Sequence, residues 1–188
     1  MPEPVASPPA RCDTRQRRAI VQAAFALGVP RDYGRRRQLA LVREPRELAC
    51  IGADIHARLQ WLAPRAARAW RQMHESAARD GVDLQIVSAF RSAEYQLGII
   101  QRKLQGGQHI DDILRVSAAP GYSEHHSGRA LDITAAGFAA LEETFEHSLA
   151  FAWLLRHAAR HGFTLSYPRD NRHGIAYEPW HWCWHRSA

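Results

Sequence analysis

The order of apolar and polar residues in the first part of the chain predicts helices. Apolar side chains recur at helical spacing over residues 14–28, and a glycine followed by a proline ends the pattern. Residues 31–45 are charged and irregular, so we expect them to connect two elements, whereas helical patterning returns around residues 46–60. A clearer helix is predicted over residues 64–81, because it begins with a proline, which suits the first turn, and ends at a glycine.

The middle of the chain combines short strands and helices. A short apolar run with β-branched residues, 84–90, predicts a buried strand. Residues 92–106 then predict a helix that begins at a capping serine and ends at two glycines, and a second short helix fits residues 109–116. A glycine-containing loop leads from there into a strand that is predicted over residues 129–134.

The C-terminal part has one strong helical pattern and further strands. Residues 148–161 predict a helix that a serine caps and a glycine closes. Its core-facing side chains are expected to be Phe151, Leu154, Leu155 and Ala158. A strand over residues 163–167, a loop and a final pair of strands around residues 175–184 complete the chain. Helices beside a few strands, without regular βαβ alternation, predict an α+β domain with a small, mainly antiparallel sheet.

Length and composition fit this picture. The chain has 188 residues, of which 46% are apolar, and this is enough for one domain with a hydrophobic core. Four prolines among the first ten residues predict a disordered tail over residues 1–12. Residues 13–45 are expected to form a helical N-terminal extension of unknown role, and residues 46–188 are expected to form the main domain.

Charge and cysteine content exclude several classes of function. The formal net charge is +6, but it is carried by scattered arginines without helix-turn-helix or zinc-finger spacing, so we expect no nucleic-acid partner. The three cysteines lack CxxC spacing and do not indicate a disulfide framework.

We expect a monomer without a transmembrane segment. No signal peptide is recognisable, which leaves a cytoplasmic location and a non-classical export route as alternatives.

Two polar clusters interrupt the apolar pattern of the second half of the chain. In the first cluster, His125 lies near the end of the glycine-containing loop, and Asp132 follows inside the predicted strand between Leu131 and Ile133. A buried aspartate costs free energy unless it is paired or binds a metal. Taken alone, this cluster favours an aspartate that caps a turn over a metal ligand.

The second cluster, residues 178–181, places a carboxylate and a histidine in the aromatic C-terminal segment. Together His125, Asp132 and His181 make a three-ligand set that leaves a fourth tetrahedral position open, as in catalytic zinc sites. Glu178 is then the unligated carboxylate that is expected to take a proton from water. The proline in this segment excludes the helical spacing of H-E-x-x-H proteases, so the pair must lie on an extended or bent segment.

These clusters resemble the VanY-type D-alanyl-D-alanine carboxypeptidases of the Hedgehog/D,D-peptidase fold. The matching stretches, in the family's order, are SAFRSAEYQ (88–96), PGYSEHHSGRALDI (120–133), HGFTLSYP (161–168) and YEPWHW (177–182). The resemblance implies one zinc ion per chain, bound by His125, Asp132 and His181. It also implies that Glu178 is the general base, and that residues 46–188 are the zinc peptidase catalytic domain.

The same resemblance implies roles for three further residues. Arg91 stands at the arginine of the family's YRS motif and is implied to polarise the scissile carbonyl or to hold the substrate carboxylate. A guanidinium fork suits both tasks. Ser123 and Gln96 match positions that line the substrate site in related enzymes.

The residues next to the proposed ligands allow more than one interpretation. Cys183 shares a face with His181 if the segment is extended, yet we expect a buried, inert thiol rather than a ligand. Glu124 is expected to point away from the metal, because adjacent side chains diverge in an extended loop. His126 is expected either to support a ligand indirectly or to be exposed. Core packing, rather than a sugar-binding wall, is expected for the tryptophans Trp180, Trp182 and Trp184.

The function implied by the resemblance is that of a D,D-carboxypeptidase. Such an enzyme would hydrolyse the terminal D-Ala bond of peptidoglycan stem peptides or muropeptides. An endopeptidase that cuts inside the stem and an L,D-carboxypeptidase of the same fold remain alternatives. A non-catalytic, zinc-containing cell-wall binding module is a further alternative, which the presence of both Glu178 and Arg91 disfavours.

Overall fold

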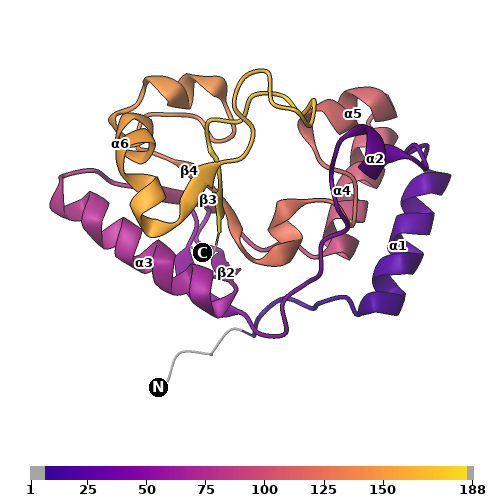
Figure 1. Cartoon of the computed structure of the whole chain (residues 1–188), viewed down its shortest axis with the longest axis horizontal. Coiled ribbons are helices and arrows are strands. Elements are labelled where there is room, and N and C mark those ends of the chain that lie inside the picture. The colour runs from indigo at the N-terminus through magenta and orange to yellow at the C-terminus, as the bar shows by residue number, and fades with distance from the viewer. Residues whose placement is uncertain (1–6, 186–188) are drawn as a thin grey trace.

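The computed structural model describes residues 7–185 and has an α+β architecture, as the sequence predicts (Figure 1). The helices are α1 (Thr14–Ala26), α2 (Tyr33–Arg36), α3 (Pro64–Arg79), α4 (Ala93–Gln105), α5 (Ile110–Val116) and α6 (Leu149–His157). The strands are β1 (Ala49–Ala53), β2 (Leu59–Leu62), β3 (Gln85–Ser88), β4 (Ala130–Thr134), β5 (Phe163–Leu165) and β6 (His181–Trp184). Short 3-10 helices are η1 (Glu124–Ser127), η2 (Glu143–His147) and η3 (Ala158–His161).

Four strands form an antiparallel sheet in the order β3-β4-β6-β5, and β1 and β2 form a separate hairpin. In this sheet Asp132 of β4 lies opposite His181 of β6 on one side and opposite Ser88 of β3 on the other. The prediction of a small, mainly antiparallel sheet is therefore confirmed. The sheet also brings together two segments that lie about fifty residues apart in the chain.

The main hydrophobic core lies between the sheet and the helices α3 and α6. Trp70 and Met73 of α3 pack with Leu131 and Ile133 of β4, and all four side chains are buried. The C-terminal tryptophans belong to this core, as expected: Trp182 is buried within it, and Trp180 and Trp184 pack against it. Within residues 7–185, no helix has both the length and the hydropathy that a membrane span requires.

One predicted core position of α6 is wrong. Leu155 is 58% exposed, whereas Phe151, Leu154 and Ala158 are buried. A helix on the surface of a domain buries one face, on which side chains recur about every 3.6 residues. Leu155 is rotated by about 100° around the helix axis from Leu154 and lies beyond the edge of this buried face. Leu155 therefore lies on the solvent-facing side of the helix.

A second apolar cluster joins the N-terminal segment to α4 and α5. It contains Ala24, Val29, Tyr33, Ile100 and Ile113. The connection beyond α2 also bonds to the rest of the chain, since the backbone nitrogen of Val42 donates to the oxygen of Gly121 at 2.8 Å. Residues 13–45 therefore pack against α4 and α5. Part of the expected disordered tail, residues 1–6, lies outside the described residues.

The prediction of a helix around residues 46–60 is wrong, because this segment forms the β1–β2 hairpin. Gly52 has a φ of +107° at the irregularity in the pairing of the two strands, a conformation that glycine adopts readily. Asp54 then closes the turn, and its Oδ1 accepts hydrogen bonds from the backbone nitrogens of His56 and Arg58 at 2.8 and 3.0 Å. These local bonds stabilise a turn where the apolar spacing predicts a helix.

The prediction of a final pair of strands around residues 175–184 is also wrong, because only β6 forms in this segment. The backbone of the preceding residues bonds to two different places: the nitrogen of Ala176 donates to Arg115, and that of Glu178 donates to Tyr167. Pro179 has no N–H group for a strand ladder. The segment before β6 is therefore bent, in agreement with the prediction made from the proline.

Candidate metal centre

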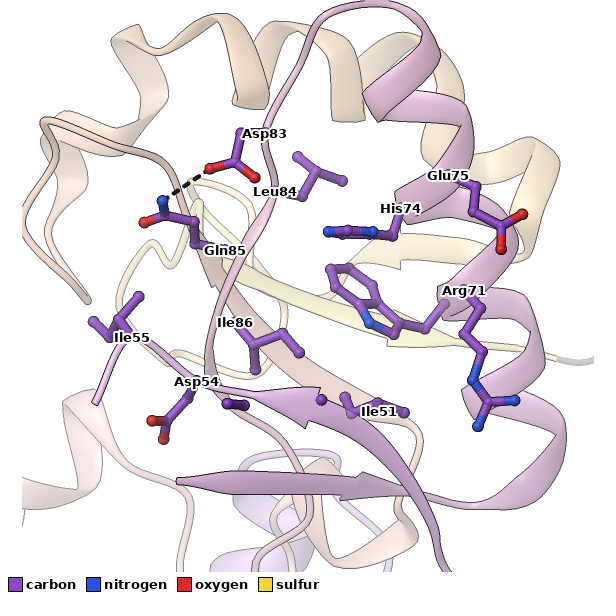
Figure 2. A pocket seen from close by; sticks show the side chains of 13 residues that line it. Ile51, Asp54, Ile55, Arg71, His74, Glu75, Asp83, Leu84, Gln85 and Ile86 are labelled. Atoms are coloured by element: carbon purple, nitrogen blue, oxygen red, sulfur yellow. Dashed lines mark hydrogen bonds between the residues drawn. The ribbon is translucent and has the colours of Figure 1, made fainter. Parts of the chain in front are cut away.

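A cavity of about 560 Å³ lies between α3, β1 and β3, away from the predicted site residues (Figure 2). Its lining combines apolar side chains, such as Ile51 and Ile86, with the charged residues Arg71, Glu75 and Asp83. None of the residues that the sequence singles out lines this cavity. The chemistry predicted from the sequence therefore belongs to another part of the fold.

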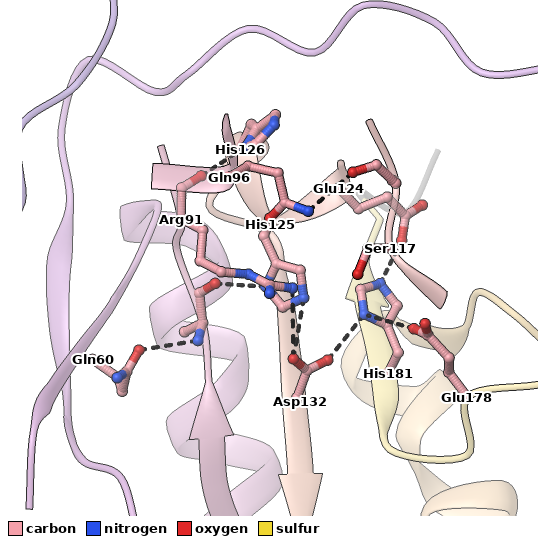
Figure 3. A network of polar contacts seen from close by, with 12 residues as sticks. Gln60, Arg91, Gln96, Ser117, Glu124, His125, His126, Asp132, Glu178 and His181 are labelled. Atoms are coloured by element: carbon pink, nitrogen blue, oxygen red, sulfur yellow. Dashed lines mark hydrogen bonds and ion pairs between the residues drawn. The ribbon is translucent and has the colours of Figure 1, made fainter. Parts of the chain in front are cut away.

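The three predicted ligands converge at the end of the central strands (Figure 3). Asp132 lies on β4, His181 begins β6 and His125 lies on η1, and all three side chains are buried. Their ligand atoms lie within 4.8 Å of one another, which fits the set to a single metal ion. The antiparallel register of β4 and β6 provides two of the ligands, and the 3-10 helix that precedes β4 provides the third.

A glycine makes the tight connection between His125 and Asp132 possible. Gly128 ends η1 with a φ of +63°, which favours glycine. A Cβ atom at this position would lie 2.9 Å from the backbone nitrogen of Ala63. That nitrogen also donates to the oxygen of Gly128 at 2.7 Å. The close approach therefore fixes the loop from which His125 reaches the site.

The hydrogen bonds of His125 assign its tautomer. Its Nδ1 lies 2.6 Å from the oxygen of Ala89, and a carbonyl only accepts, so Nδ1 carries the proton. Its Nε2 has no hydrogen-bond partner among the described residues and faces Asp132 Oδ2 at 3.3 Å. Burial, together with the charge of Arg91, lowers the pKa of His125 to about 4, so the ring is neutral near pH 7. A lone pair and a carboxylate facing each other in this way fit a cation between them.

His181 lies between two carboxylates. Its Nδ1 lies 3.0 Å from Asp132 Oδ1, and its Nε2 lies 2.9 Å from Glu124 Oε2. Burial opposes the charged form of this histidine, but the hydrogen bonds to Asp132 and Glu124 outweigh it and raise the pKa to about 10. Both ring nitrogens therefore carry a proton near pH 7, and a metal at this site would replace the proton on Nδ1 while Nε2 still donates to Glu124.

The contact of Glu124 with His181 contradicts the expectation that Glu124 points away from the site. Burial opposes ionisation of Glu124, yet the hydrogen bond and the charge of His181 lower its pKa to about 2. The expectation assumed an extended loop, in which neighbouring side chains point to opposite sides. Residues 124–127 instead form the 3-10 helix η1, in which successive side chains are rotated by about 120°. Glu124 and His125 therefore reach the same site from different directions.

Glu178 lies beside the proposed ligands without belonging to the ligand set. Its Oε2 is 3.8 Å from Nδ1 of His181. A hydrogen bond from its backbone nitrogen to the oxygen of Tyr167 holds the bend before β6. Burial raises the pKa of Glu178 to about 7, with the charge of His181 acting in the opposite direction. A carboxyl group with such a pKa can both take up and release a proton near neutral pH.

Arg91 reaches the centre from the end of β3. Its Nη2 lies 3.8 Å from Asp132 Oδ2, and its Nε is buried without a hydrogen-bond partner among the described residues. His126 holds the backbone here, since its Nδ1 donates to the oxygen of Arg91 at 2.7 Å while its Nε2 accepts from Gly121 at 3.1 Å. His126 is thus a buried support for Arg91, which fits one of the two expectations for this residue. No local pattern in the sequence indicates these partners.

A pocket of about 500 Å³ opens onto the three proposed ligands. Ser123 and Gln96, the other two residues expected at a substrate site, both line it and are buried. Gln96 donates through Nε2 to the oxygen of Ala118 at 2.9 Å, and its Oε1 has no partner among the described residues. Cys183 is also buried, but its sulfur does not belong to the group of close ligand atoms within residues 7–185. Burial, followed by the charge of Glu124, raises the pKa of this thiol, which fits an inert cysteine.

Comparison with known proteins places this chain in a family. Residues 59–187 match the VanY family, described as D-alanyl-D-alanine carboxypeptidase. The chain is 33% identical over 129 residues to YodJ, a putative carboxypeptidase of Bacillus subtilis (strain 168), in a match that covers 65% of this chain and 45% of that protein. The curated relatives that it matches are longer, and the chain spans between 36% and 65% of their lengths.

Two solved structures have a similar fold. One is the LdcB LD-carboxypeptidase, with a TM-score of 0.68 and 28% identity, covering 77% of this chain and 75% of that one. The other is a point mutant of the D,D-pentapeptidase VanY from the VanB-type resistance cassette, in complex with Zn(II). It has a TM-score of 0.56 and 26% identity, and covers 73% of this chain and 78% of that one.

Proposed function

This chain belongs to the VanY family of D-alanyl-D-alanine carboxypeptidases, and we propose that it is a zinc-dependent D,D-carboxypeptidase. Its substrate would be a peptidoglycan stem peptide or muropeptide, from which it removes the terminal D-alanine. The observation that carries this proposal is the buried set of His125, Asp132 and His181, which opens to a pocket beside Glu178. A closed structural zinc site would need a fourth protein ligand.

The donor set of the site fits one zinc ion. Nε2 of His125, a carboxylate oxygen of Asp132 and Nδ1 of His181 would hold it. When bound, zinc supplies a Lewis acid that polarises a carbonyl group and makes water more acidic. Glu124 fixes the orientation of His181 from the opposite side of the ring, as carboxylates commonly do for histidine ligands.

Glu178 is proposed to transfer protons, and Arg91 is proposed to stabilise developing charge. Glu178 takes a proton from the attacking water and later returns it to the leaving amine, because its pKa of about 7 allows both steps. Arg91 presents a guanidinium to the pocket and stabilises the negative charge that develops on the carbonyl oxygen of the substrate. Ser123 and Gln96 contribute polar groups to the pocket wall.

An L,D-carboxypeptidase is the second candidate, since the LdcB LD-carboxypeptidase has a fold similarity with a TM-score of 0.68. The two reactions use the same catalytic groups and differ in the configuration of the residue before the cleaved bond. The test is mass spectrometry of purified muropeptides after incubation with zinc-loaded protein. Loss of one alanine from pentapeptide stems supports the D,D-activity, and loss from tetrapeptide stems supports the L,D-activity. Products cut inside the stem would support an endopeptidase, and no cleavage at all would contradict the enzymatic proposal.

A further inference from the structure

Helix α4 presents one face to the catalytic pocket. Gln96, Ile99 and Lys103 lie at positions i, i+3 and i+7 of this helix, and all three line the pocket. The start of the helix is fixed because Oγ of Ser92 accepts from the backbone nitrogen of Tyr95 at 3.1 Å. Lys103 is the only lysine of the chain, and its side chain is half-buried.

The ammonium group of Lys103 has no carboxylate partner among the described residues. Its Nζ donates to Oγ of Ser117 at 3.3 Å, and none of the ion pairs within residues 7–185 includes it. Burial lowers the pKa of Lys103, the charge of Arg91 lowers it further, and Glu178 acts in the opposite direction. Two cations thus share one partly desolvated pocket, an arrangement that an anionic ligand stabilises.

The two cations enter the pocket from different elements. Arg91 follows β3 and is directed at the metal centre, where its Nη2 lies 3.8 Å from Asp132 Oδ2. Lys103 comes from the far end of α4 and approaches beside Ser117. A substrate whose scissile carbonyl lies at the metal ligands places its C-terminal carboxylate only one residue away. Arg91 and Lys103 both line the pocket that contains the proposed ligands, so one cation is available for the carboxylate and one for the carbonyl oxygen that becomes negative during the reaction.

On the basis of the proposed carboxypeptidase function, we propose that Lys103 binds the free C-terminal carboxylate of the substrate. Arg91 is then left to stabilise the charge on the scissile carbonyl oxygen. The compact ammonium of a lysine acts as a point charge with rotatable donors, which can pair with a single carboxylate. In this assignment Lys103 makes the enzyme specific for peptides that end in a free C-terminal carboxylate.

The test measures the binding of two peptides that differ only at the C-terminus. One peptide ends in D-Ala-D-Ala with a free carboxylate, and the other is its C-terminal amide. Calorimetric titration into zinc-loaded Glu178→Gln protein avoids turnover. We expect the free peptide to bind at least about tenfold more tightly than the amide, the scale of one charge-assisted contact. In the Glu178→Gln/Lys103→Met double variant this preference should fall to about twofold or less, while the affinity for the amide stays unchanged.

The matched control is Arg102→Met in the same Glu178→Gln background. Arg102 is the neighbouring cation on α4, but it lines a different cavity and lies over the ring of Tyr95. Its loss should leave the preference for the free carboxylate intact. Three results would overturn the assignment: a preference that survives Lys103→Met, an equal loss of affinity for both peptides, or no binding of either. If the preference depends on Lys103 but wild-type protein does not cleave the free peptide, only the proposed function fails.

Discussion

At the scale of single residues, the two carboxylates beside His181 have different environments, which fit the two different tasks proposed for them. Glu178 has a pKa of about 7, because its burial is only partly offset by nearby positive charge. Glu124 has a pKa of about 2, because it is paired directly with His181. A proton-transferring group needs the first environment, and a group that orients a ligand needs the second. The geometry therefore separates two acidic residues that the sequence places beside proposed ligands.

For Glu178 we predict a loss of chemistry without a loss of metal. Glu178→Gln keeps the size of the side chain but removes its ability to accept a proton. We expect kcat on a D-Ala-D-Ala-terminated peptide to fall by at least about 100-fold, the scale of general acid–base catalysis. The zinc content and the thermal unfolding curve should match those of the wild type. Near-normal turnover by this variant would remove Glu178 from the mechanism.

For Glu124 we predict the opposite pattern, a loss of metal affinity. Glu124→Ala removes the acceptor that fixes the ring of His181, and we expect zinc affinity to fall about 10- to 100-fold. Competition with a chromogenic chelator measures this change directly. Glu75→Ala is the control, because Glu75 lies in the separate cavity beside α3. Unchanged zinc affinity in the Glu124 variant would show that its contact with His181 does not support the metal.

At the scale of elements, the helices were more predictable from the sequence than the hairpin. The helices α1, α3 and α4 were predictable because caps, prolines and glycines mark their ends locally. The β1–β2 hairpin was not, since its turn depends on the buried carboxylate of Asp54 and its position on a contact distant in sequence. Gln60 bonds to Asp54 through Nε2 at 2.8 Å and accepts from the nitrogen of Ala89 at 3.0 Å. Such a connection appears in no local pattern.

The connection between η1 and β4 gives a prediction at this scale. Gly128 and Gly137 both have positive φ values, +63° and +85°, but only Gly128 has backbone within reach of an added Cβ atom. We expect Gly137→Ala to lower the free energy of unfolding by about 1 kcal/mol, the conformational cost alone. Gly128→Ala should cost clearly more and also weaken zinc binding, because it displaces the loop that carries His125. Equal losses in denaturant titrations of the two variants would show that the close approach to Ala63 is unimportant.

At the scale of the whole molecule, the site lies between two apolar clusters. One cluster joins the sheet to α3 and α6, and the other joins α1, α4 and α5. The three proposed metal ligands reach the pocket from the sheet side, and α4 forms its wall on the helical side. The grouping of His125, Asp132 and His181 was predictable because these residues stand out as polar residues in apolar segments. The positions of Glu124, His126 and Lys103 around the site were not predictable, since they depend on how distant elements pack against one another.

The central claim is that one zinc ion, held by His125, Asp132 and His181, is required for carboxypeptidase activity. Titration of zinc into chelator-treated protein, with release of D-alanine measured at each step, tests this claim most directly. The account predicts that activity rises linearly and stops rising at about one zinc per chain, as expected for a single tight site. The Asp132→Ala variant should remain folded and show no such rise. Activity that survives chelation, or that rises in the Asp132→Ala variant as in the wild type, would contradict the account.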